Sequence, residues 1–81
     1  MTLAFVLINI QSRAEEEVLK EIRKLPNVTE VYTVYGTYDL IVKIEADTME
    51  KIKETIGLGI RKIDKVQSSI TMTVVESHKR V

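Results

Sequence analysis

The sequence predicts an α+β domain in which a four-stranded antiparallel sheet carries two helices on one face. Four segments have the β-branched, aromatic or alternating composition of strands, and two segments between them repeat apolar residues at helical spacing. These elements run strand–helix–strand twice, and a short break containing glycine joins the two halves. Right-handed crossovers then place both helices on the same face of the sheet, which is the ferredoxin-like arrangement β-α-β-β-α-β.

Length and composition limit the functions that the chain could have. Its 81 residues suffice for one domain with a single core, and the formal net charge is zero. A dedicated nucleic-acid binder is usually basic, so we expect no direct nucleic-acid partner. The absence of cysteine excludes disulfides, thiolate metal sites and a cysteine nucleophile, and the single histidine, His78, leaves little for zinc binding or general-base catalysis. We therefore expect no metal, no cofactor and no enzymatic activity.

The first half of the chain is predicted to form a strand and a helix. Residues 3–10 are almost continuously apolar, which is typical of a strand buried on both faces. This run is too short to span a membrane and has no basic lead-in like that of a signal peptide, so we expect a cytoplasmic protein without a membrane partner. Ser12 and Glu15 have the spacing of a capping box. The spacing predicts a helix over residues 13–25 that ends at Pro26.

The centre of the chain is predicted to form a tight hairpin. Residues 28–35 and 38–46 have strand composition, and Gly36-Thr37 separates them. A two-residue loop that begins with glycine favours a type II′ turn, with Gly36 at positive φ.

A second helix and a last strand complete the chain. The sequence from Asp47 to Glu50 offers an N-cap, and one apolar face then follows at helical spacing, formed by Met49, Ile52, Ile56, Ile60 and Ile63. Gly57-Leu58-Gly59 is unusual inside this helix, because each interior glycine costs roughly 1 kcal/mol relative to alanine. Residues 66–75 alternate as a strand, with Val66 and Ser68 on the face of Ile70 and Met72.

The first predicted strand is apolar on both faces, although two helices can cover only one face of the sheet. One face presents Ala4, Val6, Ile8 and Ile10, and the other presents Leu3, Phe5 and Leu7. Ile41 of the third strand, or the opposite set of that strand, adds to the uncovered face. Monomers rarely expose apolar patches above a few hundred Å². We therefore expect a homodimer of the dimeric α/β barrel type, packed sheet to sheet.

The hairpin carries the most suggestive polar groups. All three tyrosines fall between residues 32 and 38, and Asp39 is a residue type that strands disfavour. A carboxylate beside exposed turn N–H groups could bind both ends of a small zwitterion. Each residue also has a purely structural interpretation, in which Gly36 makes the turn, Tyr38 packs against its neighbours and Asp39 accepts hydrogen bonds from turn N–H groups.

The last strand adds a polar face formed by Gln67, Ser69 and Thr71. Its hydroxyls could donate hydrogen bonds to a ligand carboxylate. Nucleophilic catalysis needs an adjacent base and a third orienting group, and the only histidine lies in the tail. Hydroxyls decorating a sheet face are therefore the better interpretation within this strand.

Three segments resemble one known family. They are Leu-Pro-Asn-Val at residues 25–28, Tyr-Gly-Thr-Tyr-Asp-Leu at residues 35–40 and Val-Gln-Ser-Ser-Ile-Thr at residues 66–71. With the apolar first strand and the element order, they resemble the effector-binding and oligomerisation (RAM) domain of the Lrp/AsnC transcriptional regulators. The resemblance covers essentially the whole chain, with residues 1–76 as the domain and 77–81 as a polar tail.

The resemblance implies an amino-acid-sensing module without catalytic activity. In that family the domains pair through their sheets, dimers assemble into rings of eight or more subunits, and amino acids bind between dimers. The implied ligand-binding residues are Gly36, Tyr38, Asp39, Gln67, Ser69 and Thr71. Asp39 would pair with the ligand's ammonium group, with Tyr38 packing beside it. Ser69 and Thr71 would donate to its carboxylate, and Gly36 would permit close approach of the ligand or of a neighbouring subunit.

Two departures from the family pattern qualify this resemblance. Full-length regulators carry an N-terminal helix-turn-helix domain, whereas this chain begins at the first strand. It therefore resembles the stand-alone form, which we expect to influence transcription by assembling with full-length regulators. Asp64-Lys65 stands in place of the family's Pro-Gly before the last strand.

Two other classes of function stay open. One is a small dimeric barrel enzyme, such as a cofactor-free oxygenase or isomerase. Such enzymes generally place His, Trp or Arg inside the barrel, and this chain has no Trp and only a tail His. The other is a structural ring or adaptor that binds no ligand.

Overall fold

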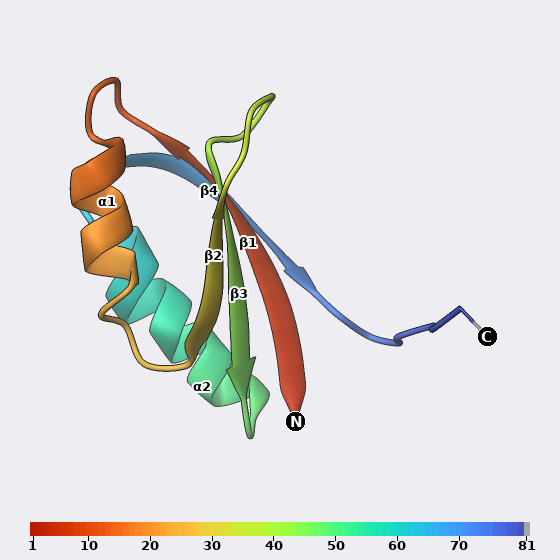
Figure 1. Ribbon diagram of the computed structural model, residues 1–81. Coiled ribbons are helices and arrows are strands. Elements are labelled where there is room, and N and C mark those ends of the chain that lie inside the picture. Colours follow the sequence, from red (N-terminus) through yellow and green to blue (C-terminus); the bar gives the residue numbers. More distant parts are fainter. Residues whose placement is uncertain (81) are drawn as a thin grey trace.

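Two helices lie on one face of a four-stranded antiparallel sheet, as the sequence predicts (Figure 1). The computed structural model describes residues 1–80. Its strands, in the sheet order β2-β3-β1-β4, are β1 (Thr2–Ile10), β2 (Val28–Thr33), β3 (Leu40–Ala46) and β4 (Val66–Thr73). Its helical elements are α1 (Glu15–Ile22), α2 (Met49–Glu54), the π-helical turn η1 (Thr55–Gly59) and the 3₁₀ turn η2 (Ile60–Lys62). Within this part of the chain no helix has the length and apolar composition needed to cross a bilayer.

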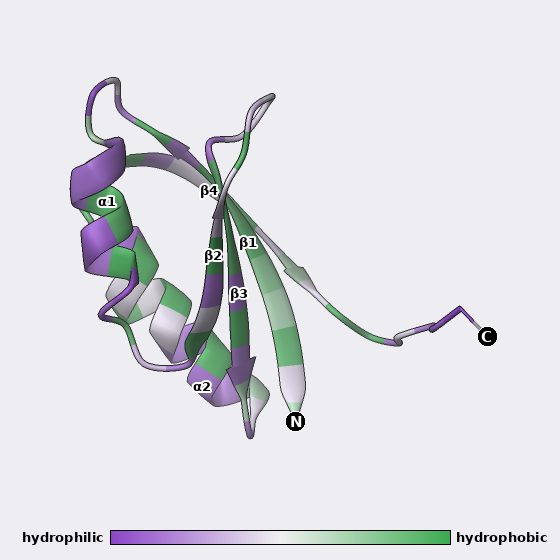
Figure 2. Cartoon of the chain, in the orientation of Figure 1, coloured by the Kyte–Doolittle hydropathy of each residue, from purple (hydrophilic) through white to green (hydrophobic). Residues whose placement is uncertain are grey.

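The core lies between the sheet and the helices, and strand alternation builds it. Alternate residues of the two central strands are buried under the helices, namely Ala4, Val6, Ile8, Ile10, Leu40, Val42, Ile44 and Ala46. Val18, Ile22, Ile52 and Ile60 cover them from the helical layer. Each fully buried Val, Leu or Ile side chain contributes about 1.5–3 kcal/mol. The hydrophobic residues of the helices accordingly face the sheet, and their hydrophilic residues face outward (Figure 2).

The first helix is shorter than predicted, and the predicted capping box is wrong. Arg13 adopts a left-handed conformation with φ 68°, and the helix begins at Glu15 with Ala14 at the N-cap. The Glu15 carboxylate accepts a hydrogen bond from the Arg13 N–H at 3.1 Å, so it does not bond back to Ser12. The helix ends at Ile22, and two further turn hydrogen bonds lead the chain to Pro26.

The predicted two-residue hairpin turn is also wrong. The ladder between β2 and β3 ends at the pair Thr33 and Leu40, and the Val34 N–H donates to the Asp39 carbonyl at 3.0 Å. Residues 35–38 therefore form a four-residue loop, and Asp39 precedes β3 instead of lying within a strand. Gly36 has the predicted positive φ, at 152°.

The second helix begins as predicted and then changes its winding. The Thr48 hydroxyl accepts a hydrogen bond from the Lys51 N–H at 3.3 Å, which confirms an N-cap in this segment. Regular α-helix ends at Glu54, whereas the sequence predicts a helix through Ile63. The two glycines that are unusual for a helix lie in the π-helical turn η1.

The alternation predicted for β4 breaks at a bulge. Ile10 pairs with Val66 but Asn9 pairs with Ser68, so Gln67 is the extra residue between the two pairs. Val66 consequently packs against the core, while Ser68 is exposed and accepts a hydrogen bond from the Asn9 side chain. The strand ends at Thr73, and the following segment extends away from the body of the domain (Figure 1). Of the predicted tail, Val81 lies outside the described residues.

Candidate functional site

Asp39 is held at the end of β1 by two hydrogen bonds. Its N–H donates to the Ile8 carbonyl at 2.9 Å, and its Oδ2 accepts from the Ile10 N–H at 2.8 Å. The carboxylate is half-buried and forms no ion pair within residues 1–80. Gly36 is exposed and Tyr38 is half-buried in the loop that precedes it. Asp39 thus has a structural role, and it also leaves a negative charge without a cationic partner.

The predicted residues of β4 lie on the other side of β1. Ser69 pairs with Ile8 and Thr71 with Val6, so both side chains lie on the face that the helices cover. Because neighbouring strands are about 4.8 Å apart, the backbones of Asp39 and Ser69 are about 10 Å apart. Gln67 is exposed at the bulge. One chain therefore brings Asp39 and Ser69 to the same end of the sheet but leaves Thr71 further along it.

Thr71 lines a cavity between α2 and the edge strand β4, and sequence reasoning missed this cavity. Its volume is about 420 Å³, and its lining residues are Met49, Ile52, Lys53, Ile56, Gly57, Arg61, Thr71 and Thr73. The Thr71 Oγ1 atom is sealed from solvent and has no hydrogen-bond partner within residues 1–80. The signal in the sequence was the pair of glycines in the second helix, because the π-helical turn places Gly57 in the cavity wall. We call this the α2–β4 cavity.

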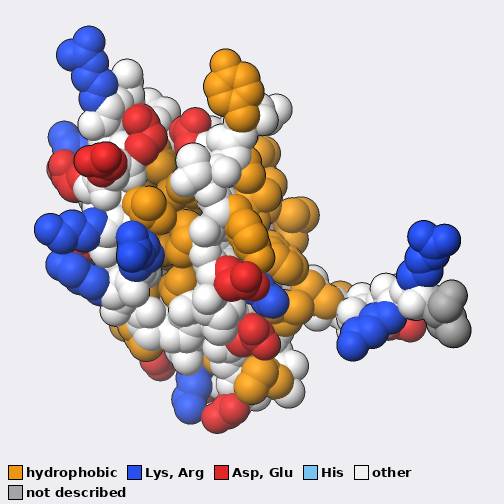
Figure 3. Space-filling view, in the orientation of Figure 1, with side chains coloured by type: hydrophobic (Ala, Val, Ile, Leu, Met, Phe, Trp, Pro, Cys, Tyr) orange, Lys and Arg blue, Asp and Glu red, His pale blue; other side chains and the backbone are white. Residues whose placement is uncertain are grey.

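The face of the sheet opposite the helices is apolar, as predicted. Phe5 and Leu7 of β1 pair with Met72 and Ile70 of β4, which are about half exposed. On the other side of β1, Leu7 pairs with Ile41. Hydrophobic side chains gather over the sheet side of the molecule in the space-filling view (Figure 3). This uncovered sheet face has no covering element among the described residues.

A polar cluster borders the uncovered sheet face. Lys43 Nζ lies 3.3 Å from Glu30 Oε1 and 3.8 Å from Glu45 Oε1. The Tyr32 hydroxyl donates to the Glu30 carboxylate, and this bond and the neighbouring Lys43 ammonium lower the pKa of Glu30. The hydrogen bond to Glu30 also raises the pKa of Tyr32 and that of Lys43.

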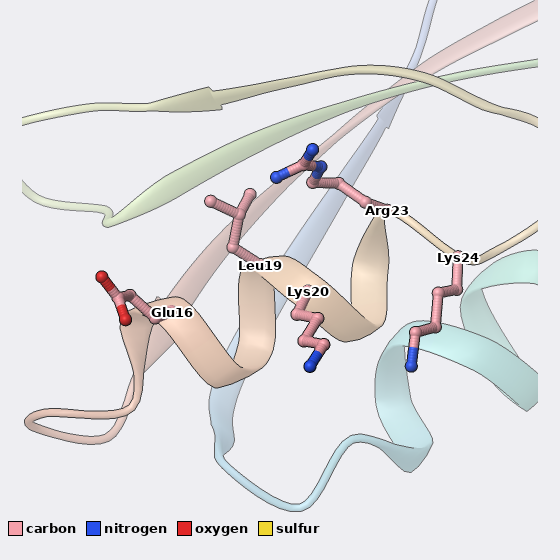
Figure 4. A pocket seen from close by; sticks show the side chains of 5 residues that line it. All are labelled: Glu16, Leu19, Lys20, Arg23 and Lys24. Atoms are coloured by element: carbon pink, nitrogen blue, oxygen red, sulfur yellow. The ribbon is translucent and has the colours of Figure 1, made fainter.

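One hollow on the surface of the described residues does not coincide with the predicted site. It has a volume of about 700 Å³, runs along α1 and is lined by Glu16, Leu19, Lys20, Arg23 and Lys24 (Figure 4). In the close-up Leu19 and Arg23 point toward the strands, whereas Lys20 and Lys24 point away from them. Their long side chains are solvated, and Lys24 pairs with Glu21 at 3.8 Å. No three His, Asp or Glu side chains in the described part of the chain could hold a metal ion together.

Comparison with known proteins establishes the class to which this fold and these segments belong. The sequence profile of the Lrp/AsnC ligand binding domain matches residues 3–81, so the chain belongs to the Lrp/AsnC ligand-binding-domain family. A relative from Pyrococcus horikoshii, the HTH-type transcriptional regulator FL11, is 35% identical over 77 residues, which are 95% of this chain and 50% of that protein. The chain thus spans about half the length of the curated relatives it matches, and those relatives are named as transcriptional regulators.

Solved structures of similar length share the same fold. The crystal structure of FFRP-DM1 is 40% identical, has a TM-score of 0.87 and covers 93% of this chain and 100% of its own. The structure of TTHA0845 from Thermus thermophilus is 30% identical, has a TM-score of 0.92 and covers 99% of this chain and 100% of its own.

Proposed function

We propose that this chain is an amino-acid-sensing and oligomerisation module of the Lrp/AsnC type. It acts on transcription by assembling with partners that carry a DNA-binding domain. Its family membership supports the regulatory role, since its relatives are helix-turn-helix regulators that extend well beyond the matched segment. The amino-acid site lies at the hairpin and includes Gly36, Tyr38 and Asp39.

The observation that carries the amino-acid proposal is the unpaired charge of Asp39. A half-buried carboxylate that is oriented by the Ile10 N–H and has no cation beside it is a suitable partner for an ammonium group. Charge-assisted hydrogen bonds of this kind contribute about 1.5–3 kcal/mol. The N–H groups of the exposed loop around Gly36 would donate to the ligand's carboxylate. Ser69 lies two strands away from Asp39, and Thr71 faces the α2–β4 cavity, so neither hydroxyl reaches that carboxylate within one chain. In this proposal β4 of a second copy completes the site.

Oligomerisation is the second part of the proposal, and the uncovered sheet face supports it. A sheet-to-sheet homodimer buries Phe5, Leu7, Ile41 and the half-exposed Ile70 and Met72. A larger ring of dimers, of eight subunits or a similar number, then brings the hairpin of one dimer to β4 of the next.

The substitution Asp39→Asn tests the amino-acid site. We expect at least a tenfold loss of affinity for the amino acid that a thermal-shift screen of the twenty amino acids identifies, because the neutral amide keeps the hydrogen bond from Ile10 and loses only the charge. Calorimetry measures the affinity, and urea unfolding checks that the fold persists.

The matched control is Asp47→Asn, which removes the same charge beyond the opposite end of β3 and should leave the affinity unchanged. If no amino acid binds the wild-type chain at millimolar concentration, the amino-acid part of the proposal is wrong and the adaptor function is favoured.

A further inference from the structure

We propose that the groove between α1 and the edge strand β2 docks a segment of a partner protein that carries several carboxylates around one large apolar side chain. We call it the α1–β2 groove, and it is lined by Leu19, Arg23 and their neighbours on the two elements. This surface goes beyond the proposed function, because it shares no residue with the hairpin site or with the uncovered sheet face. The proposal depends on neither of them.

Two adjoining hollows form the groove. One runs along α1 with a volume of about 700 Å³, and the other lies between α1 and β2 with a volume of about 370 Å³. Leu19 and Arg23 line both hollows and point toward the strands, so the two hollows are continuous (Figure 4). β2 is an edge strand, and within residues 1–80 no further strand closes the groove beside it. Ligand sites commonly have volumes of about 300–1,000 Å³, so the groove has room for an apolar side chain and the residues that flank it.

The floor of the groove is apolar and only half-buried. Val28 and Val31 pair with buried residues of β3, so their side chains lie on the face of the sheet that the helices cover. Leu19 points toward them from α1 and is half-buried, but within residues 1–80 it does not pack against the core. Apolar side chains are visible between the basic side chains over α1 and the strand β2 (Figure 3). An apolar side chain of a partner would remove this floor from water, and the proposed sheet-to-sheet dimer leaves it accessible.

The cations along the groove are poorly paired. Lys20, Arg23 and Lys24 line the hollow that runs along α1. Within residues 1–80 Lys20 and Arg23 form no ion pair. Lys24 lies 3.8 Å from Glu21, but both side chains are exposed, and such pairs contribute little. A carboxylate that enters the groove would therefore meet three cations, and the guanidinium of Arg23, where the hollows join, can donate two parallel hydrogen bonds to it.

Two carboxylates also line the groove without neutralising it. The Glu30 carboxylate is already held by the Lys43 ammonium and the Tyr32 hydroxyl. Glu16 is exposed on the first turn of α1. The dipole of α1 favours cations near its C-terminal end, which explains their sign but not the half-exposed apolar floor beside them. The cations and the floor together match a partner segment in which carboxylates flank an apolar residue.

A protein segment fits this groove better than a nucleic acid does. Surfaces that bind single-stranded nucleic acids combine cations with aromatic side chains on which the bases stack, and no aromatic side chain lines either described hollow. The formal net charge of the chain is zero, whereas nucleic-acid binders are usually basic. An apolar anchor surrounded by charged contacts is, in contrast, the usual arrangement at the centre and rim of a protein interface.

NMR titration of the ¹⁵N-labelled wild-type chain with three capped pentapeptides tests the groove. The probes are acetyl-Asp-Glu-Leu-Asp-Glu-amide, the same peptide with Ser in place of Leu, and acetyl-Lys-Lys-Leu-Lys-Lys-amide. We expect the acidic leucine peptide to bind at millimolar or lower concentration, with amide shifts confined to residues 16–24 and 28–33. The serine peptide should bind about tenfold more weakly, because it lacks the apolar anchor, and the basic peptide should not bind. Equal affinity of the serine peptide, binding of the basic peptide, or no binding of the acidic leucine peptide would overturn the proposal.

Competition with a nucleic acid distinguishes the two classes of partner. A single-stranded oligothymidylate with the same number of negative charges as the acidic leucine peptide should not displace it at equal concentration. Displacement by this oligonucleotide would show that the groove recognises negative charge alone, and the proposed protein partner would then be wrong.

Two pairs of variants assign the binding to the groove. Arg23→Gln removes an exposed cation and should weaken binding of the acidic leucine peptide about tenfold, whereas Lys62→Gln removes the same charge outside the groove and should leave it unchanged. Leu19→Ala should weaken binding to a similar degree, and Leu58→Ala is its matched control, because Leu58 is 72% exposed and does not line the groove. Equal affinity of Arg23→Gln and Lys62→Gln would contradict the assignment, whatever the stability of Leu19→Ala.

Discussion

At the border of the uncovered sheet face, hydrogen bonds join the side chains of Glu30, Tyr32 and Lys43. Tyr32 and Lys43 both stabilise the ionised form of Glu30, and the hydrogen bond from Tyr32 is the larger cause of the lowered pKa. The folded chain therefore binds a proton at Glu30 less readily than the unfolded chain does. The stabilisation is present above the unfolded-state pKa of Glu30 and is lost as the pH falls through its lowered folded-state pKa.

Removal of the Tyr32 hydroxyl should raise the pKa of Glu30 toward its ordinary value. The change Tyr32→Phe deletes the donor and leaves the Lys43 contact of 3.3 Å in place, so part of the shift should remain. Carboxyl ¹³C chemical shifts followed against pH measure this value directly. Tyr35→Phe is the control, because Tyr35 is fully exposed. An unchanged pKa of Glu30 in Tyr32→Phe would show that Lys43 alone lowers it.

Among the elements, the segment from α2 to η2 differs most from a regular helix, and contacts with the first half of the chain account for this. The Thr55 hydroxyl accepts a hydrogen bond from the Asn27 side chain at 3.1 Å and lies within 3.4 Å of the Pro26 carbonyl and 3.0 Å of the Lys51 carbonyl. It joins the turn after α1 to the start of η1. Gly59 then lets Leu25 pack against the backbone.

The two glycines of η1 should respond oppositely to substitution. Gly57→Ala adds a methyl group to open space in a helical turn and should raise the free energy of unfolding by about 0.4–1 kcal/mol. Gly59→Val should lower it by about 1–3 kcal/mol, because its branched side chain overlaps Leu25. Urea unfolding measures both changes. Destabilisation of similar size by both variants would mean that η1 needs glycine for its winding and not for packing.

The whole molecule has one covered and one uncovered sheet face, and this asymmetry underlies the proposed assembly. The helices bury one set of β1 side chains completely, whereas Leu3, Phe5 and Leu7 on the other set remain partly exposed. Since no element of residues 1–80 covers this face, a second copy of the chain is the partner that its apolar character favours.

A charge placed on the uncovered sheet face should dissociate the dimer. We expect Leu7→Asp to weaken dimerisation by roughly a hundredfold or more, because an unpaired carboxylate would be buried at the interface. Analytical ultracentrifugation at micromolar concentration distinguishes dimer or ring from monomer. Leu58→Asp makes the same chemical change on the helical side, where Leu58 is 72% exposed, and should leave the sheet-to-sheet dimer intact. A monomeric wild-type chain would refute the proposed assembly.

Sequence periodicity by itself determined the element order, the buried set of β1 and the apolar character of its opposite face. It did so because strand and helix periods are local properties of the chain, and because Val6 and Leu7 must point to opposite faces in any strand. The same local chemistry correctly placed an N-cap beside Thr48 and a positive φ at Gly36. The three motif segments also indicated the family, because they occur at the expected places in the order of strands and helices.

Only the tertiary structure decided where those local rules fail. The width of the hairpin loop, the bulge at Gln67 and the winding of η1 each involve a neighbour distant in sequence. Asp39 lies outside β3, contrary to the prediction, because its carboxylate accepts a hydrogen bond from the Ile10 N–H of the neighbouring strand. Thr71 faces the α2–β4 cavity and not the hairpin, because it pairs with Val6 of β1 and therefore lies beside α2. Pairing register and packing across layers are non-local, so no window of the sequence contained them.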